Sequence, residues 1–276
     1  MSTPRGAEPP ALLVFGAHPD DCEFTTGGLA ALYKSRGSRV CFVSLTNGDA
    51  GHYVLGGATL ARRRREEAAA AAAVIGIESR VLDNHDGELL PTLDRRREVI
   101  RIIREFRPEL VLTPRPNDYH PDHRYTSMLV QDAAYIVTVP NALAFADHLP
   151  RDPVIMYVAD RFQRPYPFTP NVVIDIGAVV EQKIEMIGCH VSQVYEWLPY
   201  NVGDAESVPL DEAKRPAWLR ERLMPRLHSA ADRFRPQLAE RYGEERGGGV
   251  EFAEAFEACE YGAPFTDEAR DRLFPM

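Results

Sequence analysis

The stretch ALLVFGAHPDDCEFTTGGLAALYKSRGSRVCFVSLT, residues 11–46, predicts the fold of the chain. Its apolar run at 11–17 indicates a buried strand, and the apolar spacing of the segment that ends near Gly37 indicates a helix. A second run of β-branched and apolar residues at 39–46 indicates another buried strand. Strand, helix and strand in this order are typical of a parallel sheet that helices cover on both faces.

The same alternation continues beyond this stretch. Further strands are expected at 81–83, 109–113, 154–158 and 171–176, and helices at 58–75, 92–106, 126–139, 177–193, 211–224 and 225–242, with a flexible break at 244–249. We therefore expect an α/β fold, a Rossmann-like three-layer sandwich with a mostly parallel sheet and extra C-terminal helices.

The composition excludes several classes of protein. Against 32 Lys and Arg, the 276 residues carry 41 Asp and Glu, and a net charge of −9 argues against nucleic-acid binding. Hydrophobic residues reach 45%, too many for a disordered chain. No apolar run approaches the roughly 20 residues that span a bilayer. The four cysteines form no CxxC pair, which favours reduced thiols in a cytoplasmic protein, and residues 1–10 read as a flexible leader.

Two polar loops follow predicted strands. HPDD at 18–21 comes directly after the first strand, and HPDH at 120–123 follows the strand at 109–113. In open α/β sheets, ligands bind beyond the carboxyl ends of the strands. Adjacent aspartates repel each other unless a cation neutralises them, and His and Asp are zinc ligands. Taken alone, HPDD is also compatible with a turn that caps a helix. Together the loops predict a metal site, for which His120 and His123 are both candidate ligands.

These motifs resemble the LmbE/PIG-L family of metal-dependent N-deacetylases. Beside AHPDD and HPDH, similar segments are NGDAG at 47–51, RREEA at 64–68, DGEL at 86–89 and CHVSQ at 189–193. The resemblance covers residues 11–195, which we expect to form the catalytic α/β domain. Residues 196–276 match no motif and are expected to form a helical extension packed on the same domain.

The resemblance implies a hydrolase that removes an N-acetyl or other N-acyl group from an amino sugar or glycoconjugate. His18, Asp21 and His123 are then the metal ligands, usually for zinc, with Fe2+ as another option. Asp20 is the general base for the attacking water. A protonated His120 stabilises the oxyanion of the tetrahedral intermediate; losing such a donor costs about 100–1000-fold in rate.

Four further residues are expected near the site. The resemblance places Arg64, Asp86 and His190 there, in contact with substrate or with catalytic groups. Asp122 is expected either to orient a histidine or to cap the following helix. The expected partner is a small, sugar-containing N-acylated substrate, and the family resemblance implies a homo-oligomer.

Two other functions remain open at this point. A non-catalytic metal-binding or assembly protein can retain the same loops. A non-haem Fe(II) oxygenase can use His18, Asp20 and His123 as its two-histidine, one-carboxylate triad. The oxygenase alternative expects an all-β barrel and leaves Asp21 and His120 without a role.

Overall fold

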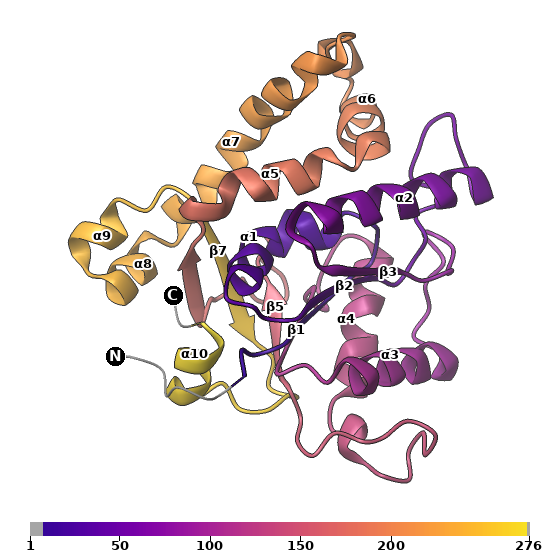
Figure 1. Cartoon of the computed structure of the whole chain (residues 1–276), viewed down its shortest axis with the longest axis vertical. Helices are drawn as coiled ribbons and strands as arrows, with labels where there is room; N and C mark the ends of the chain where they lie inside the picture. Colours follow the sequence, from indigo (N-terminus) through magenta and orange to yellow (C-terminus); the bar gives the residue numbers. More distant parts are fainter. Residues whose placement is uncertain (1–7, 275–276) are drawn as a thin grey trace.

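The computed structural model of the chain describes residues 8–274, so the expected leader lies outside the described residues up to position 7. One sheet of seven strands runs through this part of the chain in the order β3-β2-β1-β4-β5-β7-β6 (Figure 1). The strands are β1 (Leu12–Gly16), β2 (Val40–Ser44), β3 (Glu78–Val81), β4 (Leu110–Thr113), β5 (Val154–Val158), β6 (Val172–Asp175) and β7 (Ala253–Ala258). The first five pair in parallel, and β7 is antiparallel to both β5 and β6.

Helices cover both faces of this sheet, which confirms the predicted three-layer α/β fold (Figure 1). One face carries α1 (Asp21–Ser35), α2 (Gly57–Ile75) and α5 (Val180–Gly188), and the other carries α3 (Leu93–Phe106) and α4 (Pro121–Ala133). The later helices are α6 (Leu198–Asn201), α7 (Arg215–Arg233), α8 (Arg235–Tyr242), α9 (Glu244–Gly248) and α10 (Asp267–Leu273).

Strand β1 shows why its sequence is continuously apolar. Successive side chains of a strand point to opposite faces of the sheet. Leu12 and Val14 pack in the cluster that includes residues of α1, α5 and α7, whereas Leu13 and Phe15 pack with residues of α3 and α4. A strand that is buried on both faces has no position for a polar side chain.

Helix α4 begins five residues earlier than the sequence predicted. Pro121 occupies its first turn, where the missing N–H is not needed, and the ring of His120 accepts the backbone N–H of Asp122. The HPDH motif is therefore the start of a helix as well as the end of a strand-to-helix loop. Strand β3 also differs from its prediction, since it covers 78–81 where 81–83 was expected.

The C-terminal region departs furthest from expectation. Helix α7 continues through Pro225, because Leu219, Leu223 and Leu227 bury one face of it. Residues 244–248 form α9 where a flexible break was expected. Strand β7 lies in a segment expected to add only helices, and its sequence AEAFEA has weak strand propensity. Its place between β5 and β6 depends on tertiary contacts.

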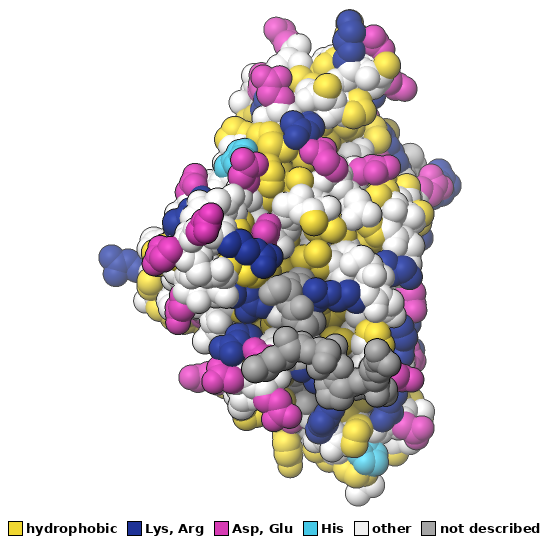
Figure 2. Space-filling view, turned by 60° about the vertical axis from the view of Figure 1, so that its left-hand side comes forward, with side chains coloured by type: hydrophobic (Ala, Val, Ile, Leu, Met, Phe, Trp, Pro, Cys, Tyr) yellow, Lys and Arg dark blue, Asp and Glu magenta, His cyan; other side chains and the backbone are white. Residues whose placement is uncertain are grey.

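The surface mixes charges of both signs. On the face turned forward in Figure 2, basic and acidic side chains alternate between hydrophobic ones, and no large field of one sign is visible. All four cysteines are free, in agreement with the predicted reduced thiols. Within residues 8–274, no helix is both long and apolar enough to cross a membrane.

Candidate metal centre and active site

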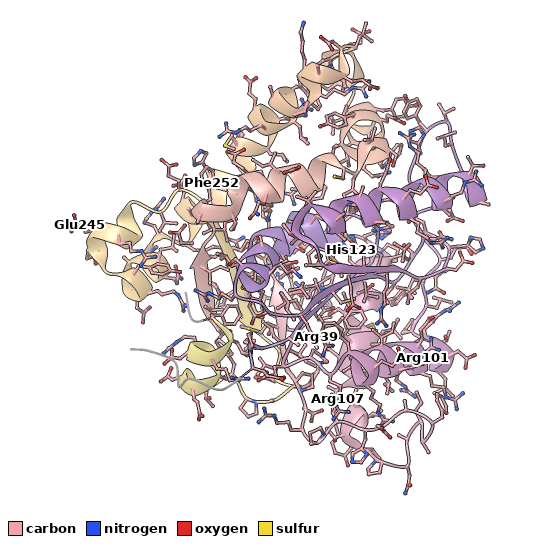
Figure 3. The ribbon with its side chains drawn as sticks, viewed as in Figure 1. Arg39, Arg101, Arg107, His123, Glu245 and Phe252 are labelled. Atoms are coloured by element: carbon pink, nitrogen blue, oxygen red, sulfur yellow. The ribbon has the colours of Figure 1, made fainter. Side chains whose placement is uncertain are left out.

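The two histidine-containing loops meet at one edge of the sheet. Strands β1 and β4 are direct neighbours in parallel, so the loops that follow them leave the sheet side by side. In Figure 3, His123 lies apart from Arg39 and Arg107, which precede β2 and β4 at the opposite ends of the strands. The polar loops thus occupy the carboxyl-end crevice where open α/β sheets bind ligands.

Three potential ligand atoms form a nearly equilateral triangle. His18 Nδ1 lies 3.3 Å from His123 Nε2 and 3.5 Å from Asp21 Oδ2, and the third side, between His123 Nε2 and Asp21 Oδ2, is 3.4 Å. Ligands at about 2.0–2.1 Å from a tetrahedral zinc lie about 3.3–3.4 Å apart. These three donors therefore fit one zinc-sized cation and leave one side of it open.

The carboxylate of Asp21 is held in place and kept ionised. Its Oδ2 accepts the backbone N–H groups of Ala17 and His18, both at 2.9 Å. Burial opposes ionisation, but His123 and His18 hold the pKa of Asp21 well below its usual range. A negative ligand at this point favours a cation between the two imidazoles.

Two other sets of three potential ligands lie within 4.8 Å of one another: His18 with His120 and His123, and His18 with Asp86 and Asp122. Asp122 is already engaged, since it accepts the backbone N–H groups of Gly87 at 2.7 Å and Leu89 at 3.2 Å. The His120 ring uses Nδ1 to cap α4. We take the first triangle as the ligand set because its three sides of 3.3–3.5 Å match the spacing of donors around a tetrahedral zinc.

Carboxylates contact the second ring nitrogen of both histidines, the one that is not part of the triangle. The Nε2 of His18 lies 3.0 Å from Asp86 Oδ1 and 3.3 Å from Asp122 Oδ2, and the Nδ1 of His123 lies 3.1 Å from Asp118 Oδ2. Such contacts fix the tautomer and ring orientation of metal-binding histidines. Asp122 thus both orients a histidine and binds the amides of the DGEL loop. In the sequence, Asp118 precedes HPDH and is equally compatible with a loop cap or a substrate contact. Its Oδ1 accepts the backbone N–H of His120 at 2.9 Å, so it caps the loop while its Oδ2 supports His123.

Asp20 occupies a strained position beside the triangle. Its φ of 144° is unusual for a residue with a side chain, and such strain is common at functional sites. Burial raises the pKa of Asp20 to about 6, although Arg64 lowers it. A buried carboxyl with this pKa exchanges a proton readily near neutral pH.

Arg64 holds Asp20 from helix α2. Its Nη2 lies 3.3 Å from Asp20 Oδ2 and donates to the carbonyl of Pro19 at 2.8 Å, while its Nη1 lies 3.9 Å from Asp86 Oδ2. The guanidinium crosses the backbone at Gly48, where a Cβ would lie only 2.3 Å from Arg64 Nη1. Gly48, the first glycine of the NGDAG segment, therefore makes room for this arginine.

His120 corrects one expectation. We expected a protonated ring from the sequence, but Nδ1 accepts the backbone N–H of Asp122 at 3.2 Å, which requires an unprotonated Nδ1. Burial and the neighbouring His18 also lower the pKa of His120. The ring is therefore a neutral imidazole whose Nε2–H is the donor.

His190 lies behind the site. Its ring is fully buried, with Nε2 3.3 Å from Glu23 Oε1 on α1, outside hydrogen-bonding geometry. Burial alone would lower the pKa of His190, but Glu23 outweighs it and the pKa is raised. The ring is not part of the triangle, and it acts on Asp20 only through its charge.

A cavity of about 830 Å³ opens from this cluster toward the C-terminal helices. Asp20, Asp21 and His123 line one end of it. The opposite wall comes from the loop after β5 and from α7, and includes Asp160, Arg161, Phe162, Arg222, Arg226 and Arg233. Also lining it is Arg115, which is 1% exposed and pairs with Asp160 through two contacts of 2.6 Å. Nothing in the sequence around these residues marked them.

Comparisons with known proteins identify relatives of this chain. The family model described as PIG-L, GlcNAc-PI de-N-acetylase, matches residues 13–134. A diacetylchitobiose deacetylase of Thermococcus kodakarensis is 32% identical over 200 residues, which cover 68% of this chain and 74% of that protein. A 1D-myo-inositol 2-acetamido-2-deoxy-alpha-D-glucopyranoside deacetylase of Saccharopolyspora erythraea is 29% identical, with 69% and 80% covered. The solved N,N'-diacetylchitobiose deacetylase of Pyrococcus horikoshii superimposes with a TM-score of 0.68 at 26% identity, over 95% of this chain and 89% of that one.

Proposed function

This chain belongs to the PIG-L (LmbE-like) family of de-N-acetylases, and on that premise we propose that it is a zinc-dependent hydrolase that removes an N-acetyl group from an amino sugar or glycoconjugate. The observation that carries the proposal is the triangle of His18, Asp21 and His123, with sides of 3.3–3.5 Å, beside a buried carboxyl whose pKa is about 6. A ligand set and a proton-transfer group in one crevice are what amide hydrolysis requires.

His18, Asp21 and His123 would hold the metal. When bound, zinc supplies a Lewis acid for the amide carbonyl and a water whose pKa falls to about 7. Two nitrogen ligands and one oxygen ligand suit zinc, and they also suit Fe2+. Asp86, Asp118 and Asp122 would keep the two imidazoles oriented, since each lies within 3.3 Å of a ring nitrogen that points away from the triangle.

Asp20 would move the proton. As a carboxylate it takes a proton from the attacking water, and as a carboxylic acid it returns that proton to the leaving amine. A pKa of about 6 suits both halves of this cycle near neutral pH. Arg64 holds the carboxylate at 3.3 Å and limits how far burial raises its pKa.

His120 would stabilise the oxyanion as a neutral donor. Its Nδ1 is committed to the backbone of α4, so Nε2–H is the group available to a substrate oxygen. A fixed, neutral donor needs no reorganisation when negative charge develops on the carbonyl oxygen. The ring of His120 packs edge-on against that of His18, with 4.6 Å between the ring centres, and so lies next to the triangle.

An amino sugar is the substrate class that we propose. The relatives named above are, as their names say, deacetylases of N-acetylated sugars. In this chain Tyr119 is 74% exposed where the cavity opens, and its ring lies 6.0 Å from His123 and 6.2 Å from Phe162. Aromatic faces stack on sugar rings, so Tyr119 is suited to cover the substrate. A homo-oligomer and a cytoplasmic location stay predictions.

The two other functions have less support. The oxygenase alternative expected an all-β barrel, whereas the sheet is mostly parallel and covered by helices. It also used the carboxylate of Asp20, which pairs with Arg64. A purely binding protein has no need of a buried carboxyl or of a histidine donor placed beside the ligand cluster.

The experiment that tests the proposal measures free amine release from N-acetylated sugars, amino acids and polyamines. Activity should disappear with a chelator, return with zinc, and be absent from the His18→Ala/His123→Ala double variant. Full activity of the double variant would contradict the metal role. No amine release from any N-acetylated sugar would contradict the substrate class.

A further inference from the structure

One wall of the cavity carries three arginines that form no salt bridge within the described residues. Arg161, on the loop after β5, and Arg226 and Arg233, on α7, all line the cavity that contains Asp20 and Asp21. Within the described residues 8–274, none of the three guanidinium groups lies within 4.0 Å of a carboxylate oxygen. The chain as a whole has a net charge of −9, so acidic partners are not scarce.

The other cations that line the cavity are neutralised. Arg115 pairs with Asp160 at 2.6 Å, and Lys183 pairs with Glu254 at 2.5 Å. Arg222 pairs with Asp204. The carboxylates of this wall are therefore already paired with other cations, and the three remaining arginines form no ion pair with them.

Local contacts hold these arginines without cancelling their charge. Nη2 of Arg161 donates to Ser229 Oγ on α7 at 2.7 Å. The guanidinium of Arg233 donates to the carbonyl of Asp160 and lies 4.7 Å from the centre of the Phe234 ring. Such contacts reduce the freedom of the side chains before any ligand arrives, which lowers the entropy lost on binding.

Arg226 connects this wall with the catalytic end of the cavity. Its guanidinium lies 5.2 Å from the centre of the Phe24 ring, and Phe24 follows the metal-ligand candidate Asp21 by three residues on α1. Both Phe24 and Arg226 line the cavity. One ligand in this cavity can therefore contact Arg226 with one group and the triangle with another.

Clustered like charges repel one another, and an anion placed among them removes that repulsion. The planar guanidinium fork matches the oxygens of carboxylates and phosphates, and hydrogen bonds to such ions are stronger than those between neutral groups. A neutral sugar would leave this wall unused. The wall also lies outside residues 13–134, which match the family model, so it is a feature of this chain's C-terminal region.

We propose that the substrate carries an oxyanion, a carboxylate or a phosphate, which Arg161, Arg226 and Arg233 bind while its N-acetyl group lies at the triangle of His18, Asp21 and His123. This inference rests on the proposed deacetylase function and narrows its substrate class to anionic N-acetylated sugars. The three arginines act as specificity-determining residues, remote from the bond that breaks.

Kinetics with matched sugars test the inference. N-acetylglucosamine is the neutral substrate, N-acetylglucosamine 6-phosphate carries a phosphate, and N-acetylmuramic acid carries a carboxylate. We expect kcat/KM for at least one anionic sugar to exceed that for the neutral sugar by about tenfold or more, and Arg226→Gln to lower this ratio by about 10–100-fold. Which anionic sugar is preferred distinguishes phosphate from carboxylate.

Arg220→Gln is the matched control. Arg220 lies on the same helix but pairs with Glu181 and does not line the cavity. Its substitution should leave the ratio between anionic and neutral sugars unchanged. An equal loss in the Arg220 and Arg226 variants would point to a general change in helix α7 and would overturn the assignment.

A binding measurement separates this inference from the proposed activity. Calorimetric titrations of the zinc-loaded protein use glucosamine 6-phosphate, muramic acid and glucosamine as probes. We expect an anionic probe to bind about 10–100-fold more weakly to Arg226→Gln, with affinity falling as salt rises. Equal affinities for the variant and the parent protein overturn the anion site, even if neutral sugars are deacetylated. Arginine-dependent binding without any deacetylation overturns the proposed activity and retains the anion site.

Discussion

The N-terminal region, from β1 to α4, and the C-terminal region of this chain contribute to one cavity in different ways. Between Leu12 and Ala133, every candidate ligand and proton-transfer group lies in a short connection at the end of a parallel strand or in the first turns of the next helix. Between Val154 and Leu273, the cavity-lining residues come from β5 and the loop after it, from α5, α6 and α7, and from β7, far apart in the sequence. Local connections place the chemistry, and long-range packing places the wall opposite it.

The C-terminal region also supports the helix that begins at the metal triangle. Glu254 of β7 accepts the backbone N–H groups of Gly28 and Leu29 on α1, both at 2.8 Å, and pairs with Lys183 of α5 at 2.5 Å. A Cβ at position 28 would lie 2.7 Å from Ile176, so glycine permits this close approach. The two regions are thus distinct in chemistry but joined in packing, and substitutions can test how far the distinction holds.

The largest effect is expected from the triangle. Asp21→Ala or His123→Ala removes one of three donors, so zinc binding should weaken by about 100-fold or more and deacetylation should fall by about 1000-fold or more. Metal content after dialysis and amine release measure the two effects. Asp94→Ala, an exposed residue on α3, is the control and should retain both. Retained metal in the Asp21 variant would contradict the ligand assignment.

Asp20→Asn is expected to come next. The amide cannot accept the proton of the attacking water, so kcat should fall by about 100–10,000-fold while zinc content stays at one ion per chain. Measurement of kcat beside metal content separates proton transfer from metal binding. A variant with near-normal kcat would assign the base to another group.

His120→Gln should lower kcat by about 100–1000-fold, since one donor to the oxyanion is lost. KM should change much less than kcat, because the donor acts on charge that develops during the reaction. The control is His148→Gln, which replaces an exposed histidine outside the cavity. An effect confined to KM would indicate that His120 binds ground-state substrate instead.

The pH profile gives a smaller effect. Asp20 acts as a base when ionised, so activity is present above its pKa and lost as the pH falls through about 6. Arg64 lowers this pKa, so Arg64→Gln should move the acidic limb of kcat/KM to higher pH. Arg65→Gln, an exposed neighbour that lies 3.9 Å from Asp83, should not move it. A limb that stays in place in the Arg64 variant would contradict the role of this arginine.

The smallest effect on rate is expected in the C-terminal region. Phe256 of β7 is fully buried against Phe274, so Phe256→Ala should lower the free energy of unfolding by about 3–5 kcal/mol through loss of burial and a residual cavity. Denaturant unfolding measures this change, and kcat per folded, zinc-loaded molecule should stay within about threefold, since Phe256 does not line the cavity. A large fall in kcat with unchanged stability would erase the distinction between the two regions.

The sequence by itself predicted most elements of the N-terminal region and a metal site at the ends of its strands. Apolar runs on strands that are buried on both faces, and polar motifs directly after them, predicted the α/β fold and a metal site, and the family resemblance then implied His18, Asp21 and His123 as its ligands. These signals are local: a strand, its loop and the next helix lie within a few residues of one another. The protonated form of His120 was wrong because the ring caps α4, a contact that the motif alone does not reveal.

Only the tertiary structure decided the far wall and the seventh strand. AEAFEA has no β-branched residue, and it forms β7 because β5 and β6 offer it hydrogen bonds and because Lys183 neutralises the buried Glu254. No sequence motif distinguishes Arg161, Arg226 and Arg233 from the other arginines of the chain. They line one wall of the cavity only because α7 packs beside the loop after β5. Burial and electrostatic pairing depend on residues that are distant in the chain, so no local pattern could have shown which arginines would lack a partner.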